Sequence, residues 1–194
     1  MEAAMSPDTL FERVNREAMS DRHKASWDRS KELHGDTTFV EVLANAPDAY
    51  DWYNDAFYRD LFYSGRVDRK LVELVRLYLA GRHGCASCNR SDWAAALAAG
   101  YTEEQLDSLH DPENGPFEER EKAILALASV MSLANAADVV EPDLHARLRT
   151  SFSTGELVEF GMIMAILTGM AKFILAFDLL ERLKSCPFTT PGRK

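Results

Sequence analysis

The feature that most constrains this chain is the stretch from Glu73 to Asp92, ELVRLYLAGRHGCASCNRSD, which contains its only closely spaced pair of cysteines. A helical pattern of apolar residues ends shortly before the pair, near Ala80, and an alanine-rich run follows it. The spacing therefore predicts two helices joined by a turn, with Cys85 and Cys88 in the first turn of the second helix.

This placement favours redox chemistry of the two thiols. Unpaired N–H groups and the dipole at a helix start stabilise a nearby negative charge by about 0.3–1 kcal/mol, which favours a thiolate. Cysteines three apart at a helix start are also close enough to form a small disulfide. We therefore predict a dithiol that cycles between reduced and oxidised forms. The alternative is that Cys85 and Cys88 are two small side chains that pack a helix start.

Glu73 lies among apolar residues on the helix before the cysteines. A carboxylate on a buried face costs free energy unless it is paired or shares a proton. Because Gly81 and Gly84 let the chain turn back, the carboxylate is expected to face the dithiol. The alternative is an ion pair with Arg76 or Arg82.

The pattern E-x11-C-x-x-C, followed by a helix of small residues, resembles the alkylhydroperoxidase D (AhpD) and carboxymuconolactone decarboxylase superfamily. The resemblance implies an all-α, AhpD-like helical bundle that forms a homo-oligomer. It also implies a thiol-dependent peroxidase or disulfide oxidoreductase that needs no cofactor and no metal. Cys88 would attack the peroxide, Cys85 would be its disulfide partner and proton donor, and Glu73 would start a proton relay. The implied partners are a small hydroperoxide and a dithiol reductant protein.

Two residues depart from the pattern that the resemblance implies. Asp92 stands where a relay histidine is expected, and Ser87 stands where a histidine often lies between the cysteines. An aspartate repels a nearby thiolate, whereas an imidazolium stabilises it. His83, two residues before Cys85, is the candidate substitute.

These departures keep two alternative functions open. The first is a non-catalytic helical binding protein on the AhpD-like scaffold, which Asp92 and Ser87 favour. The second is an enzyme of the carboxymuconolactone decarboxylase type acting on a small acidic lactone. That reaction is expected to use histidines and an anion-binding arginine, so the dithiol argues against it.

Composition argues against several other classes. Three cysteines in 194 residues do not make a disulfide framework. A structural zinc site needs about four ligands and stays a minor alternative, because no second cysteine pair is present and only His83 and His110 could be recruited. The net charge of −9 argues against nucleic-acid binding. No run approaches the roughly 20 apolar residues of a membrane span, and the acidic start does not fit a signal peptide. We therefore expect a cytoplasmic protein without a membrane segment.

The chain divides into an N-terminal helical arm (1–36), an AhpD-like domain (37–185) and a flexible tail (186–194). The arm is sparsely apolar, so it packs either across a partner subunit or on its own domain. A dense set of aromatic residues between 47 and 63 is interpreted as helical core rather than as a cofactor site. A long apolar helix is expected from Gly155 to about Leu183, and burial on several sides suits a subunit interface.

Overall fold

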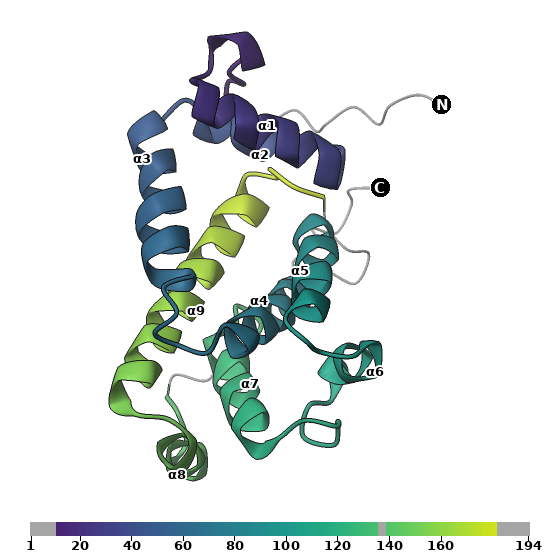
Figure 1. Ribbon diagram of the computed structural model, residues 1–194, viewed down its shortest axis with the longest axis vertical. Coiled ribbons are helices and arrows are strands. Elements are labelled where there is room, and N and C mark those ends of the chain that lie inside the picture. The colour runs from purple at the N-terminus through teal and green to yellow at the C-terminus, as the bar shows by residue number, and fades with distance from the viewer. Residues whose placement is uncertain (1–10, 136–138, 182–194) are drawn as a thin grey trace.

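The computed structural model describes residues 11–135 and 139–181 of the chain, and in these ranges it contains helices and no β-strand, which confirms the all-α class. Helix α4 runs through the centre, with α5, α7 and α9 packed around it, while α1 and α2 lie across one end (Figure 1). In chain order the elements are η1 (Arg16–Ala18), α1 (Asp21–His34), α2 (Thr38–Leu43), α3 (Pro47–Trp52), the π-helix η2 (Tyr53–Phe62), α4 (Arg69–His83), α5 (Ala86–Ala98), α6 (Glu103–Asp107), η3 (Ser108–His110), α7 (Glu119–Met131), α8 (Pro142–Ser151) and α9 (Thr154–Ala176).

Helix α4 is central because it is apolar on nearly all sides. Its side chains from Leu71 to Ala80 are buried, apart from the partly buried Arg76. The Asp68 side chain caps its start by accepting a hydrogen bond from the Lys70 N–H at 2.9 Å. Gly84 follows its last residue in the left-handed region at φ 74°, where glycine carries no steric cost. The helix therefore continues three residues beyond the predicted end at Ala80.

Local capping explains most of the remaining helix starts. The boxes of Thr102 with Gln105 and of Ser153 with Glu156 each satisfy two backbone N–H groups at the starts of α6 and α9. At α2 the capping side chain is Asp36, whose Oδ1 accepts from the Thr38 N–H at 2.9 Å. The predicted helix between 47 and 63 is present as α3 continued by η2.

Helix α9 ends at Ala176, so the predicted end near Leu183 is wrong. Asp178 adopts φ 57°, which turns the chain out of the helix, and the Leu179 N–H then bonds to the Ile174 carbonyl at 3.0 Å. Leu179 is fully buried in a cluster with Val42 and Ile174. The turn therefore ends the helix and lets the Leu179 side chain pack between α9 and α2.

The outer face of α9 remains largely uncovered. Val158 and Met162 on this face are 57% and 52% exposed. The helix has 23 residues with a mean hydropathy of 1.7 in its most apolar window, of which 22% is buried. By length and composition it could span a membrane, which corrects the expectation that no segment approaches such a span. The same properties are typical of a helix that packs inside a protein or against a second subunit.

The described part of the N-terminal arm packs on its own chain, as one of the two alternatives predicted. Met19 joins a buried cluster with Val40 and Tyr50. The Trp27 indole N–H donates to Glu41 on α2 at 2.8 Å. These contacts hold α1 against α2 and α3. The predicted flexible tail, 186–194, lies outside the described residues.

Candidate functional site

The two predicted cysteines are joined by a disulfide at the start of α5. Cys85 is the N-cap residue, and its sulfur accepts a hydrogen bond from the Cys88 N–H at 3.3 Å. The Ala86 N–H donates to the Glu181 carbonyl at 2.9 Å, which ties this helix start to the segment after α9. Cys85 is buried and Cys88 is partly exposed. Cys88 is therefore the sulfur that a small molecule reaches more readily.

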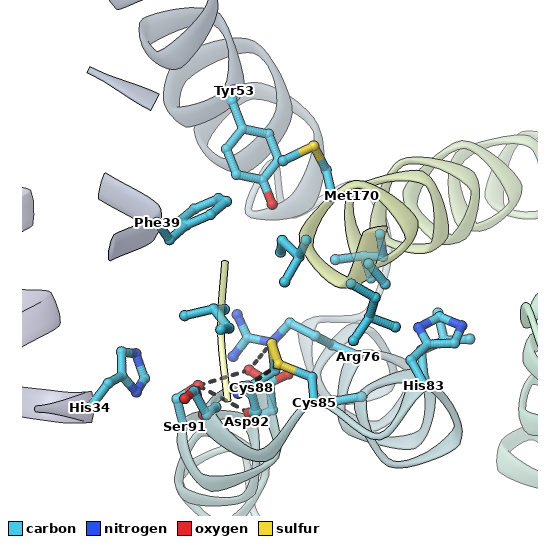
Figure 2. Close-up of a pocket in the computed structure, with 18 of the residues that line it drawn as sticks. His34, Phe39, Tyr53, Arg76, His83, Cys85, Cys88, Ser91, Asp92 and Met170 are labelled. Atoms are coloured by element: carbon cyan, nitrogen blue, oxygen red, sulfur yellow. Dashed lines mark hydrogen bonds and ion pairs between the residues drawn. A yellow bond between two sulfur atoms is a disulfide. The ribbon is translucent and has the colours of Figure 1, made fainter. Parts of the chain in front are cut away.

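Both cysteines line a cavity of about 270 Å³ between α1, α2, α3, η2, α4, α5 and α9. Figure 2 shows the disulfide beside Ser91, Asp92 and Arg76, with Phe39, Tyr53 and Met170 on the other side of the cavity. The wall opposite the disulfide is therefore apolar and partly aromatic. Other apolar and aromatic residues that line the cavity are Tyr50, Tyr58, Leu167, Ile174 and Leu180.

Glu73 does not line this cavity, although the sequence predicted that it would face the dithiol. It is buried behind Arg76, whose Nη2 lies 2.8 Å from Glu73 Oε2. Arg76 Nε lies 3.0 Å from Asp92 Oδ1. One guanidinium therefore connects the two predicted carboxylates, and Arg76 rather than Glu73 reaches the cavity. Of the two arginines considered as partners of Glu73, Arg76 forms the ion pair, while Arg82 lies over the Tyr78 ring.

Burial changes the acidity of this group. It raises the pKa of Asp92 from 3.8 to about 6; the negative charge of Glu73 adds to the rise, whereas Arg76 and the Ser91 hydroxyl oppose it. For Arg76 burial lowers the pKa, but Asp92, Tyr63 and Glu73 outweigh it and raise the pKa above its usual value. Asp92 therefore titrates near pH 6, four residues after Cys88 on the same helix.

His83 lines the cavity, but one of its ring nitrogens is already hydrogen-bonded to the backbone. Its Nε2 accepts a hydrogen bond from the Leu133 N–H at 3.2 Å, and the side chain is buried. Burial, with the nearby charge of Arg82, lowers its pKa to about 4. Figure 2 shows His83 and His34 on opposite sides of the two sulfurs in this view. His83 thus holds the end of α7 as a neutral acceptor.

The sequence did not indicate that three of the cavity residues belong to the site. Tyr53 and Tyr58 come from the aromatic segment that was interpreted as core, and their hydroxyls lie 3.4 Å apart. His34 comes from the last turn of α1. A one-turn repeat of aromatics could have suggested a cavity wall, but nothing near His34 in the sequence relates it to the cysteines 51 and 54 positions later.

Within residues 11–135 and 139–181, no three or more His, Cys, Asp or Glu side chains gather in a way that could hold a metal ion. The polar groups of the cavity are instead the disulfide, an ion-paired arginine, an aspartate, serines and two histidines. This set suits thiol chemistry with proton transfer.

Comparisons with known proteins agree with this geometry. Residues 47–113 match the model of the carboxymuconolactone decarboxylase family, and this range includes Glu73, both cysteines and Asp92. No match was found among curated proteins.

Several solved structures share the fold. One is an uncharacterized peroxidase-related protein with an alkylhydroperoxidase AhpD core from Ralstonia eutropha JMP134, at a TM-score of 0.70 and 15% identity over 92% of this chain and 94% of that one. A putative antioxidant defence protein AhpD from Agrobacterium tumefaciens has a TM-score of 0.62 and 19% identity over 73% and 96%. The debrominase Bmp8 in complex with 2,3,4-tribromopyrrole has a TM-score of 0.72 and 15% identity over 94% and 95%. The stretch around the dithiol is thus similar to the carboxymuconolactone decarboxylase family, and the helical body has the fold of the AhpD-like structures.

Proposed function

We propose that this protein is a thiol-dependent peroxidase that reduces organic hydroperoxides with the Cys85–Cys88 dithiol. The observation that carries the proposal is a disulfide in the wall of a largely apolar cavity of about 270 Å³. A cavity of this size, with aromatic rings opposite the sulfurs, favours a substrate with an apolar body over hydrogen peroxide alone.

The proposed reaction begins from the reduced dithiol. The Cys88 thiolate attacks the outer oxygen of the hydroperoxide, forming a sulfenic acid and releasing an alkoxide, which takes a proton to become the alcohol. The Cys85 thiol then attacks the sulfenic sulfur, forming the disulfide and releasing water. One hydroperoxide is thus reduced to one alcohol and one water for two thiols oxidised. A dithiol reductant protein, proposed as the partner, would restore the thiols.

Two features bear on which sulfur attacks. The N-cap position places Cys85 Sγ on the Cys88 N–H, which stabilises a thiolate at Cys85. Access favours Cys88, because Cys85 is only 4% exposed. We give access the greater weight, since Cys88 is the more exposed of the two sulfurs that line the cavity. Cys85 as the N-capped partner is then the better leaving thiolate when the disulfide is reduced again.

The ion pairs of Arg76 argue against a lactone decarboxylase. Such a reaction calls for an arginine free to bind a substrate carboxylate. Arg76 is the cavity arginine, and two carboxylates already lie 2.8 and 3.0 Å from its nitrogens. Its charge is therefore compensated within the protein, and an acidic substrate would meet Asp92 beside it.

A second candidate is removal of a halogen from an aromatic ring, which the ring-lined wall of Phe39, Tyr53 and Tyr58 favours. The fold is also that of a debrominase. In this reaction an aryl bromide and the dithiol give the arene, the disulfide, bromide and one proton. It consumes the same two thiols as peroxide reduction, so the product distinguishes the two reactions.

Thiol titration tests the proposal. The chain is taken in a Cys186→Ser background, so that Cys85 and Cys88 are its only thiols. Reduced protein is exposed to cumene hydroperoxide, hydrogen peroxide or a bromopyrrole, and free thiols and bromide are measured. We expect loss of two thiols per chain with cumene hydroperoxide, and no loss in the same chain carrying Cys88→Ser.

Other outcomes select the alternatives. Thiol loss only with the bromopyrrole, accompanied by bromide release, would replace the peroxidase with the dehalogenase. Unchanged thiols with every oxidant, while aromatic compounds still bind, would favour the non-catalytic binding protein.

A further inference from the structure

A second histidine reaches the dithiol cavity from a distant part of the chain. His34 ends α1 and lines the cavity together with Cys88 and Ser91. Figure 2 shows its ring on the Ser91 side of the disulfide, pointing toward the cavity. It lies outside the range that matches the family model, which begins at residue 47. The site is therefore completed by the N-terminal arm.

The position of His34 is set by the packing of α1. On the same helix, His23 Nε2 lies 3.1 Å from Asp51 Oδ1, and Arg22 pairs with Asp55. Ser30, one turn before His34, donates to the Asp36 carbonyl at 2.8 Å. These contacts fix α1 near both of its ends. The position of α1 in turn holds the His34 ring in the cavity wall.

One ring nitrogen of His34 is unpartnered. Its Nδ1 is buried and makes no hydrogen bond within the described part of the chain. A buried polar atom without a partner costs about 1–3 kcal/mol, so this nitrogen gains a hydrogen bond only when the ring turns and exposes it to the cavity. By contrast, the Nε2 of His83 is occupied by the Leu133 N–H. His34 is thus the cavity imidazole that is free to exchange a proton.

The surroundings keep His34 uncharged at neutral pH. Burial lowers its pKa, and the positive charge of Arg90 on α5 lowers it further, while Asp36 after α1 opposes the change. A neutral imidazole accepts a proton from a thiol and yields it to a stronger base such as an alkoxide.

We infer that His34 is the proton carrier of the dithiol cavity, an inference that rests on the proposed peroxidase function. The imidazole takes the proton of the Cys88 thiol, leaving the thiolate that attacks the hydroperoxide. The resulting imidazolium then gives that proton to the departing alkoxide, which leaves as the alcohol. His34 ends the step in its starting form, and Cys88 ends it as the sulfenic acid. This role falls to a residue that sequence spacing does not connect with the cysteines.

The test uses the full chain with His34→Gln and, as a matched control, His110→Gln. His110 is exposed in η3 and does not line the cavity. In a Cys85→Ser, Cys186→Ser background, Cys88 is the only thiol, and its alkylation by iodoacetamide at pH 7 reports thiolate formation without any peroxide. In the Cys186→Ser background, stopped-flow oxidation by cumene hydroperoxide reports the complete step.

We expect His34→Gln to slow alkylation about 10-fold and oxidation about 100-fold, the scale of a positioned general acid and base. His110→Gln should leave both rates unchanged. Added imidazole should restore part of the rate in His34→Ala, which a purely structural loss would not allow. Equal alkylation rates in His34→Gln and His110→Gln, or a loss in His34→Ala that imidazole does not restore, would overturn the inference. Failure of the proposed function would appear separately, as no thiol oxidation in the His34-containing protein, because the alkylation assay needs no peroxide.

Discussion

The two sides of the cavity are built differently. The side formed by α4 and α5 comes from one continuous stretch and carries the disulfide, Arg76 and Asp92. The opposite side is assembled from α1, α2, α3, η2 and α9 and supplies His34, aromatic rings and aliphatic side chains. The first side lies within the family match, whereas of the second side only α3 and η2 do. In the proposed function the continuous side supplies the sulfurs, while the assembled side supplies the substrate contacts and the proton carrier His34.

The largest effect is expected at the sulfurs. Cys88→Ser should abolish thiol oxidation by hydroperoxides, because Cys88 is the accessible cavity sulfur. In the Cys186→Ser background, Cys85→Ser should still react once and then stop as a sulfenic acid, because no second thiol remains in the chain to resolve it. Mass spectrometry after dimedone labelling checks this asymmetry. Labelling of Cys85 in a Cys88→Ser protein would instead make the N-capped sulfur the nucleophile.

The next effect concerns the buried charges beneath the sulfurs. Arg76→Met should lower the free energy of unfolding by about 3–5 kcal/mol, because it leaves Glu73 and Asp92 buried without their shared cation. The exposed pair of Arg59 with Asp60 provides the matched control, and Arg59→Met should cost about 0–1 kcal/mol. Urea unfolding measures both. Similar losses of unfolding free energy for the two variants would show that Glu73 and Asp92 do not depend on Arg76 for their burial.

Much of the continuous side could be predicted from sequence, because its partners are close along the chain. The cysteine spacing and the glycine turn each predicted the geometry found. The direction of the Glu73 side chain could not be predicted, since it depends on which arginine lies between it and the cavity. His34 could not be predicted either, because its place depends on how α1 packs against α2 and α3. The end of α9 at Ala176 depended on the burial of Leu179, which only the tertiary structure reveals.

A pH-dependent effect is expected from Asp92. Its folded pKa of about 6 exceeds the unfolded value of 3.8, so the folded state binds the proton more tightly. The resulting stability is fully present below pH 4 and is lost as the pH rises through about 6, by up to about 3 kcal/mol. Asp92→Asn removes this titration, so the stability of the native chain relative to the variant should fall between pH 4 and 7. A constant difference across that range would contradict the raised pKa.

A smaller effect is expected on the assembled side, where a substitution should weaken substrate binding without changing the reaction at the sulfurs. Phe39→Leu trims the aromatic wall, so the KM for cumene hydroperoxide should rise about 10-fold, within the roughly 1–3 kcal/mol typical of apolar pocket contacts. The rate with hydrogen peroxide should be unchanged, because that molecule has no apolar body to contact the ring. Steady-state kinetics with both substrates makes the comparison. Equal losses with the two would mean that Phe39 supports the sulfurs rather than the substrate.

We also propose that copies of the chain associate through the uncovered face of α9. Met162→Asp should weaken that association at least 10-fold, about 1.4 kcal/mol, because it places a charge on an exposed apolar face. Val139→Asp, at another exposed apolar position, is the control and should have no effect. Light scattering over a concentration series measures the mass. A single-chain mass for the unsubstituted protein at all concentrations would contradict the proposal.

The most direct test of the central claim is a single-turnover stoichiometry. Reduced Cys186→Ser protein is mixed with excess cumene hydroperoxide in the absence of any reductant, and cumyl alcohol and the Cys85–Cys88 disulfide are both quantified. The account predicts one alcohol and one disulfide per chain, and neither product above background when Cys88 is replaced by serine. Alcohol formed without the disulfide, or thiols that remain free in hydroperoxide, would contradict it.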